Sequence, residues 1–347
     1  MIREYRREDL PALSEIWNDS VKSGEVVFHP LSEEYFHTKF ELNPNFDRRY
    51  VLTAEQNGKP AGFIIGMIKK QLLPGETFES SPGFIVAVFV RADSRRNGIG
   101  RALVNELEAR FKADGKLSVS CGSCPVDLDW TIPGTPGHDH NNVPGVDEDC
   151  QGFTFLQHLG YKVAAQEVAM YLNLKDYKPW DGLEAKRKEL LDQGIYVGRY
   201  DTSLGYDYDG MCDRVHSEYW RSVLKAEIEC HKKGVPNTDV RFIPNGKVPK
   251  GPRPILVATC GNAIIAQTGP VDLQESGRGW FTGICTDPLF ERRGVATVLF
   301  NTLMQEFIKE GAAFSTLFTG VQNHAQKIYL RTGFRVVRHF ALLKKAL

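Results

Sequence analysis

The chain has 347 residues, 42% of them hydrophobic and 25% charged, with 43 Lys and Arg balanced by 43 Asp and Glu. At about 100–200 residues per domain this length predicts two domains, and the composition excludes a disordered or fibrous protein. Zero net charge argues against a dedicated nucleic-acid-binding protein, and the longest apolar run, 83–90, is too short to span a membrane. The charged start and the odd number of cysteines, seven, predict a cytoplasmic protein with neither signal peptide nor disulfide framework.

The first half of the chain predicts an ordered series of strands and helices. A short strand and a helical stretch come first, and an antiparallel strand pair follows around the turn Gln56-Asn-Gly58. A strand ending at Val90 then leads through a charged loop into a helix whose apolar residues recur every four positions up to Phe111. A short helix ending at Gly160 and a β-rich run over 163–172 complete the series.

The second half repeats this order. After a predicted helix over 181–194, a strand near 283–286 leads through a charged loop into a helix ending near Phe307. A short helix, which Asn323 is placed to cap, ends at Gly333, and a β-rich run follows over 335–343. The repeat predicts two α+β domains, an N-terminal one over 1–174 and a C-terminal one over 195–347, joined by a helical linker over 175–194.

The first copy is longer between its main helix and its short helix. Gly98 and Gly160 are 62 residues apart, whereas Gly294 and Gly333 are 39 apart. The additional residues fall in a loop over 129–149 that is rich in Gly and Pro. Long loops are often functional, but a passive surface insertion is an equal alternative.

The two charged loops carry the clearest chemical signal. In each loop small residues precede a helix, so backbone N–H groups without an intrahelical partner can approach an anion, and flanking arginines add charge. This arrangement predicts a diphosphate site in each copy. The residues are Arg95, Arg96, Asn97, Gly98, Ile99, Gly100 and Arg101 in the first copy, and Arg292, Arg293, Gly294, Val295 and Ala296 in the second.

Other phosphate-binding motifs do not fit these loops. The dinucleotide fingerprint needs a third small residue, where the chain has Leu103 and Val298, and no Gly-Lys-[Ser/Thr] of a nucleotide-triphosphate loop occurs. The pattern [Arg/Gln]-x-x-Gly-x-[Gly/Ala] instead resembles the acyl-CoA-binding motif of the GCN5-related N-acetyltransferases, the GNAT superfamily. The first copy matches it fully, whereas the second has Glu291 at the first position.

A second motif extends the resemblance. Asn323, Ala325, Tyr329 and Gly333-Phe334 are similar to the family's Asn-x-x-Ala-x-x-x-Tyr-x-x-x-Gly-Phe helix, whereas the first copy has Leu156 in place of the tyrosine. The chain therefore resembles a tandem GNAT protein. The resemblance implies two acyl-CoA N-acyltransferase domains, each a mixed, mostly antiparallel sheet flanked by helices.

The resemblance also implies a reaction. Acetyl-CoA is the expected co-substrate, with no metal, and the amine of a small molecule is the expected acceptor, which attacks the thioester directly in a monomer or homodimer. The pantetheine arm is expected along the strand before each loop, at Val88 and Val90 or at Ile284 and Thr286, with Asn323 near the CoA. Tyr329 is expected to protonate the leaving thiolate, which favours the second copy as the site of chemistry.

The general base is not identified. Neither strand contains an acidic residue, so Asp127, Asp129, Asp272 and Glu275 in nearby loops are the candidates, and a water-mediated route needs none of them. Two alternative functions stay open: a CoA-binding regulatory protein without catalysis, and a mycothiol-synthase-like acetyltransferase. A metal site at Cys121, Cys124 and the histidines of the long loop is disfavoured, because the spacing matches no standard zinc pattern.

Overall fold

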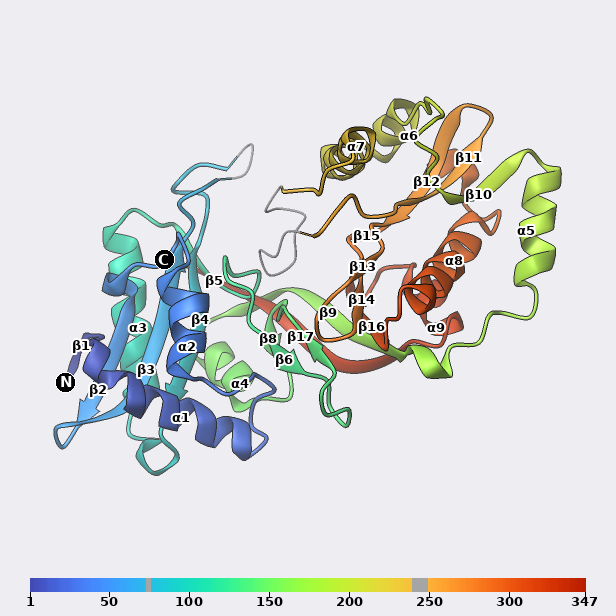
Figure 1. Cartoon of the computed structure of the whole chain (residues 1–347). Helices are drawn as coiled ribbons and strands as arrows, with labels where there is room; N and C mark the ends of the chain where they lie inside the picture. The colour runs from blue at the N-terminus through green and yellow to red at the C-terminus, as the bar shows by residue number, and fades with distance from the viewer. Residues whose placement is uncertain (73–75, 239–248) are drawn as a thin grey trace. The chain divides into compact units, whose positions relative to one another are not determined.

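The computed structural model describes residues 1–72, 76–238 and 249–347 (Figure 1). They form two compact units: unit 1 comprises Met1–Ala169 together with Val337–Leu347, and unit 2 comprises Met170–Val336. The units therefore are not two successive halves of the chain, because the segment Val337–Leu347 belongs with the N-terminal residues. Residues 175–194, expected as a linker, lie within unit 2.

Unit 1 contains helices on both faces of one sheet, and its elements follow the predicted order. They are β1 (Ile2–Glu4), α1 (Leu10–Lys22), α2 (Glu33–Phe36), β2 (Val51–Gln56), β3 (Lys59–Ile68), β4 (Gly83–Val90), α3 (Ile99–Ala113), β5 (Ser118–Cys121), β6 (Trp130–Thr131), β7 (Asp139–His140), β8 (Val146–Asp147), α4 (Gln151–His158) and the first part of β9 (Lys162–Asn173). The end of β17 (Arg335–Ala346) completes it.

The sheet of unit 1 has the strand order β1-β2-β3-β4-β5-β17. Neighbouring strands are antiparallel except β4 and β5, which are parallel and pair only over 83–85. One face packs on α1 and α2 through an aromatic cluster in which Phe89 lies 4.7 Å from Trp17 and 5.5 Å from Phe63 between ring centroids. The other face packs on α3 through Leu103 and Leu107, both fully buried.

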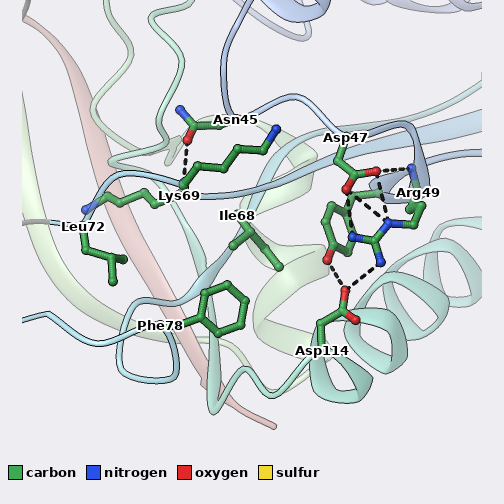
Figure 2. A pocket seen from close by; sticks show the side chains of 10 residues that line it. Asn45, Asp47, Arg49, Ile68, Lys69, Leu72, Phe78 and Asp114 are labelled. Carbon is green, nitrogen blue, oxygen red and sulfur yellow. Dashed lines mark hydrogen bonds and ion pairs between the residues drawn. The ribbon is translucent and has the colours of Figure 1, made fainter.

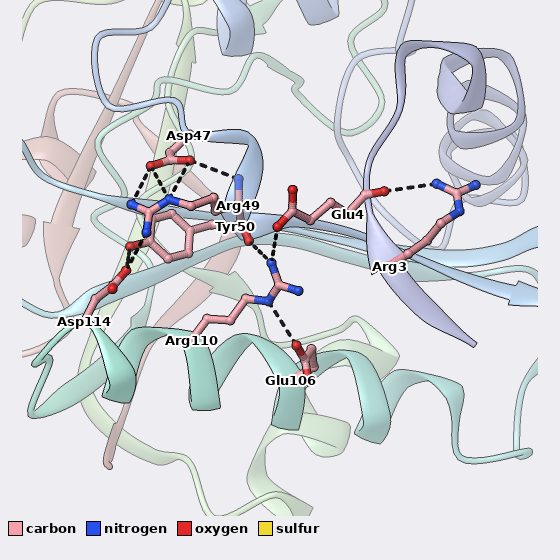
Figure 3. A network of polar contacts seen from close by, with 8 residues as sticks. All are labelled: Arg3, Glu4, Asp47, Arg49, Tyr50, Glu106, Arg110 and Asp114. Carbon is pink, nitrogen blue, oxygen red and sulfur yellow. Dashed lines mark hydrogen bonds and ion pairs between the residues drawn. The ribbon is translucent and has the colours of Figure 1, made fainter.

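A polar network fixes α3 against the edge of this sheet (Figure 3). The Arg110 guanidinium donates to Glu4 at 2.9 Å, to Glu106 at 3.0 Å and to the backbone oxygen of Arg49 at 2.7 Å. At the C-terminal end of α3, Asp114 accepts a hydrogen bond from the Tyr50 hydroxyl. These bonds join α3 to β1 and to the turn before β2, so the C-terminal half of the helix is held in place.

Unit 2 repeats the arrangement with a divided sheet. Its elements are the end of β9, α5 (Leu183–Asp192), β10 (Ile195–Arg199), α6 (Asp209–Val215), α7 (Glu218–Lys233), β11 (Leu256–Cys260), β12 (Ala263–Gly269), β13 (Asp272–Leu273), β14 (Arg278–Trp280), β15 (Gly283–Thr286), α8 (Val295–Lys309), β16 (Phe314–Gly320), α9 (Gln326–Arg331) and the start of β17. Strands β10, β11, β12 and β15 form one antiparallel sheet. Strand β14 pairs in parallel with β16 and antiparallel with β13.

Strand register shows that the repeat is structural. In unit 1 Gly83 pairs with Val119, and in unit 2 Gly279 pairs with Ser315. Both members of the second pair lie 196 positions after their counterparts, the same offset that separates Gly98 from Gly294. The predicted class, two α+β units with mostly antiparallel sheets and flanking helices, is confirmed.

Three local features differ from the expectation. The loop over 129–149 is not wholly irregular, because β6 and β7 pair in a short hairpin. Helix α9 begins at Gln326 with Ala325 as its cap, while the Asn323 side chain accepts the Ala325 N–H at 2.9 Å. In unit 1 the sheet gains β17 from the distant end of the chain, a pairing that no local pattern encodes.

Candidate functional site

Each charged loop ends in a left-handed glycine directly before its helix. Gly98 has φ 79° before α3, and Gly294 has φ 89° before α8. Two residues earlier in each loop, Arg96 and Arg292 also adopt positive φ, 65° and 60°. Non-glycine residues seldom do so, and alternating backbone handedness points successive N–H groups to one side, which forms an anion-binding concavity at a helix N-terminus.

In unit 1 the Arg95 side chain has partners within the protein. Its Nε donates to the Val90 oxygen at 2.9 Å, and its two Nη atoms donate to the Glu25 carboxylate at 2.9 and 2.7 Å. The hydrogen bond between Arg95 and Glu25 lowers the pKa of Glu25 and raises the pKa of Arg95. Arg95 therefore braces the loop against the segment after α1, and Arg96 and Arg101 are the exposed arginines of this loop.

Gly100 lies in the first turn of α3, against apolar side chains. A Cβ at Gly100 would lie 3.1 Å from the Phe155 ring and 3.6 Å from Val90 Cγ2. Val88 and Val90 are half-buried, as are Ile99 and Phe155. The glycine thus allows close packing where β4, α3 and α4 meet, and a larger residue would crowd the Phe155 ring.

The strand before each charged loop separates from a parallel neighbouring strand, β4 from β5 in unit 1 and β14 from β16 in unit 2, at equivalent positions. In unit 1 β4 pairs with β5 only as far as Ile85, so 86–90 continue beyond that pairing. In unit 2 the corresponding strand is interrupted: β14 ends at Trp280 and β15 starts at Gly283. We call residues Phe281 and Thr282 the strand break. A strand that separates from its neighbour offers backbone groups to an extended ligand.

The loop of unit 2 is more crowded than that of unit 1. A Cβ at Gly294 would lie 3.0 Å from Cδ of Lys186 on α5, whereas the space around Gly98 is open. Glu291, Arg292 and Arg293 are exposed, so the charge that departs from the motif does not point into the core. Half-buried Ile284 and Thr286 lie on β15, and Val295 is fully buried in the first turn of α8 beside half-buried Ala296.

Tyr329 lies on α9 and is 6% exposed. Its ring centroid is 4.9 Å from that of Phe300 and 6.3 Å from that of Phe334. Within the described ranges the hydroxyl makes no hydrogen bond, and burial raises the pKa of Tyr329 to about 12. In unit 1 the corresponding Leu156 is buried and contributes only packing.

The carboxylates considered as general bases differ in their surroundings. Asp272 accepts from Arg253 at 3.1 Å, and Asp129 forms an ion pair with Lys39 at 2.8 Å. Asp127 is exposed, and the Asp127 backbone oxygen accepts a second bond from Lys39 at 3.0 Å. Both Asp272 and Asp129 are therefore neutralised by a partner, which makes them weak candidates for removing a proton.

A separate pocket lies at the other end of α3 (Figure 2). Its volume is about 460 Å³, and Tyr50, Ile68, Phe78 and Asp114 are among its lining residues. Arg49 on its wall forms ion pairs with Asp47 at 2.9 Å and with Asp114 at 3.3 Å. Because Asp114 caps the C-terminus of α3 and Gly98 caps its N-terminus, the pocket is separated from the charged loop at Gly98 by the length of that helix.

The fold and the charged loop occur twice in the chain, and comparison with known proteins supplies the family. The model described as "Acetyltransferase (GNAT) family" matches residues 10–124, and that described as "Acetyltransferase (GNAT) domain" matches 251–340. Together these regions cover more than half of the chain, which belongs to the GNAT superfamily and is a tandem member of it.

Individual relatives agree with this assignment. Residues of this chain are 30% identical over 115 residues to the peptidyl-lysine N-acetyltransferase YiaC of Escherichia coli (strain K12), a match covering 32% of this chain and 66% of that protein. A GCN5-related glucosamine N-acetyltransferase region of a fungal multi-domain β-N-acetylglucosaminidase has a TM-score of 0.63 and 17% identity, covering 99% of this chain and 38% of that one. The tandem GNAT protein from the clavulanic acid biosynthesis pathway has a TM-score of 0.55 and 12% identity, and the match covers 100% of this chain and 98% of that one.

Two features are absent from the described residues: a membrane-spanning helix and a group of metal-ligating side chains. None of the helices in 1–72, 76–238 and 249–347 combines the length and apolarity needed to cross a bilayer. In the same ranges no three His, Cys, Asp or Glu side chains are grouped as metal ligands.

Several residues around the site were missed by the sequence analysis. Glu25 contacts Arg95 from a segment 70 positions away, and Lys186 reaches Gly294 from a helix expected to be a linker. No local pattern identifies such pairs. Glu227 on α7 is different, because an acidic residue seven positions after Trp220 on an apolar helix face is a visible anomaly.

Proposed function

We propose that this protein is an acetyl-CoA-dependent N-acetyltransferase that acetylates the amine of a small molecule. The observation that carries the proposal is the repeated loop, in which a left-handed glycine and a left-handed arginine precede a helix at the same register in both units. Two occurrences in one chain, each after a strand that leaves its neighbour, match what a diphosphate with an extended arm requires.

In unit 1 the loop from Arg95 to Arg101 would hold the diphosphate through backbone N–H groups, with Arg96 and Arg101 supplying charge. The arm would continue past Gly100 along Val88 and Val90. In unit 2 the corresponding groups are Arg292, Arg293 and the N–H groups of Gly294, Val295 and Ala296, and the arm would run along Ile284 and Thr286 with Asn323 nearby.

Chemistry is assigned to unit 2. The neutral acceptor nitrogen attacks the thioester carbonyl, a C–N bond forms, the C–S bond breaks, and the nitrogen loses a proton to water. Tyr329 is protonated at neutral pH, burial raises its pKa to about 12, and the hydroxyl donates its proton to the departing thiolate and recovers one from solvent. Leu156 cannot do this, so unit 1 would bind acetyl-CoA without turnover.

The substrate class is supported by the nucleophile of the curated relative, whose name specifies a lysine amine. A small molecule rather than a protein is our proposal for this chain. A non-catalytic CoA-binding regulator is the outcome to be distinguished from it by experiment.

The test is thiol release from acetyl-CoA in the presence of a panel of primary amines, with calorimetry of acetyl-CoA binding in parallel. The proposal predicts turnover with at least one small amine, and loss of binding at one site in each of Gly98→Val and Gly294→Val. Acetyl-CoA binding without turnover on any amine would instead establish a sensor.

A further inference from the structure

Helix α7 carries a carboxylate on its inward face. The buried residues of this helix are Val223, Leu224, Glu227 and Ile228, and Glu227 is 0% exposed. A glutamate in such a position must have its charge compensated by hydrogen bonds, because burial without partners is costly. Its surroundings therefore indicate what the residue is for.

Only one of the two carboxylate oxygens of Glu227 is satisfied within the described residues. Oε1 accepts from Arg253 Nη2 at 2.6 Å and from Asn237 Nδ2 at 2.7 Å. Oε2 is equally buried and accepts no hydrogen bond from the described part of the chain. Arg253 also donates to Asp272 at 3.1 Å, so Asp272 is engaged while Glu227 Oε2 is available.

This carboxylate is linked to the edge of the strand break of unit 2 through Arg253. The Arg253 guanidinium that binds Glu227 is 5.4 Å above the ring of Trp280, the last residue before the break. Two turns earlier on α7, Trp220 packs on Gly283, the first residue after it: a Cβ there would lie 2.6 Å from the indole. The strand is thus contacted after the break by Trp220 of α7 and before it by Arg253, the ion-pair partner of Glu227.

The break itself contains another buried polar atom without a partner. The Thr282 N–H donates to the Gly269 oxygen at 2.9 Å, but Thr282 Oγ1 is buried and makes no hydrogen bond in the described ranges. Unsatisfied buried groups are uncommon in folded proteins, and a polar ligand could supply partners for Glu227 Oε2 and Thr282 Oγ1.

We infer that Glu227 recognises the acceptor as an ammonium ion, with Oε2 accepting one of its N–H groups beside the strand break. The bound ammonium then loses a proton to water, and the neutral amine attacks the thioester. The inference rests on the proposed function, which places the thioester along β15. A carboxylate oxygen is the strongest acceptor available for an ammonium group, and an uncharged amine gains much less from it. The substrate class is therefore an aliphatic primary amine that is protonated in solution.

The experiment compares Glu227→Gln with the matched variant Glu229→Gln. Gln retains an oxygen for Arg253 and Asn237 and removes only the charge. Glu229 lies on the same helix, is 45% exposed and pairs at 3.7–4.0 Å with Lys232 and Lys233, so its variant reports a surface charge change alone. Thiol release is measured with benzylamine, an ammonium at pH 7.5, and with O-benzylhydroxylamine, which is neutral there.

We expect Glu227→Gln to raise KM for benzylamine by about tenfold or more, to leave O-benzylhydroxylamine within about twofold, and to leave acetyl-CoA affinity unchanged. Glu229→Gln should change none of these. Equal losses for both acceptors, or no loss for benzylamine, would overturn the inference.

Two measurements keep the inference testable if the variant misfolds or turnover is absent. In the wild-type protein KM for benzylamine should rise as pH passes the pKa of the amine, whereas KM for O-benzylhydroxylamine should stay flat over the same range. Calorimetric titration with benzylammonium chloride tests recognition without chemistry. If benzylammonium binds in a Glu227-dependent way but no amine is turned over, the proposed function is refuted and the role of Glu227 in ammonium recognition is supported. If benzylammonium does not bind, that role of Glu227 is refuted.

Discussion

Replacing Tyr329 by phenylalanine separates packing from proton donation in unit 2. The ring lies among Phe300 and Phe334 and is retained in the variant, and the hydroxyl that is lost makes no hydrogen bond within the described residues. The free energy of unfolding should therefore change by no more than about 1 kcal/mol, the usual scale for one hydrogen bond. Binding of acetyl-CoA should be nearly unchanged.

Turnover should fall much more. A general acid contributes about 10²–10⁴-fold, so the variant should lose roughly 10²-fold or more in kcat, which corresponds to about 2.7 kcal/mol at the transition state. Because the pKa of Tyr329 is raised to about 12, only about one hydroxyl in ten thousand is ionised at pH 8. The activity of the wild-type protein should accordingly show no alkaline loss from this group below about pH 11.

The assay is thiol release at saturating acetyl-CoA from pH 6 to 10, with thermal unfolding in parallel. Tyr177→Phe is the matched control, because the Tyr177 hydroxyl donates to Asn301 at 3.0 Å and burial likewise raises the pKa of Tyr177 to about 12. The control should lose some stability and keep its kcat. Full activity in Tyr329→Phe, together with loss of activity in Gly98→Val, would refute the reasoning and assign catalysis to unit 1.

Further outcomes follow from other contacts. Gly100→Val should crowd Phe155 and Val90 and weaken acetyl-CoA binding at one site by calorimetry, whereas Gly100→Ala, with its Cβ 3.1 Å from the ring, should have a smaller effect. Burial alone would raise the pKa of Asp287, but bonds from Arg214 and the Leu289 N–H hold it below its usual value. The ionised Asp287 should therefore stabilise the fold fully above about pH 4, and this stabilisation should be lost as pH falls further. In Asp287→Asn the decrease of Tm at acid pH should be smaller than in the wild-type protein. Acetyl-CoA affinity should decrease with added salt, because the exposed arginines of the loops are screened, and a salt-independent affinity would contradict a diphosphate site.

The sequence predicts those parts of the site that depend on neighbouring residues. Gly98 and Gly294 mark helix starts because a small residue with positive φ is needed there, and that requirement is local. The bond between Arg95 and Glu25 could not be predicted in this way, since it joins segments brought together only by packing of α1 on the sheet. The same holds for Lys186 beside Gly294.

The residues around the strand break include both features that can be predicted from neighbouring residues and features that depend on tertiary packing. Glu227 can be recognised in the sequence as an acidic residue on an apolar helix face, and its register with Trp220 fixes that face. Its partners Arg253 and Asn237 come from other segments, and only the folded chain shows that Oε2 is left without one.

The pairing of β17 with β5 has a consequence for how the protein is made. Leu343 pairs with Cys121, so unit 1 cannot complete its sheet when its own first 169 residues leave the ribosome. At about 5–20 residues per second, the missing strand is synthesised roughly 10–45 s after β5. During that interval the edge of β5 is exposed and can pair with β17 of another chain. Synthesis at high concentration should therefore favour dimers that exchange β17, and slower expression or chaperone binding at this edge should favour the monomer.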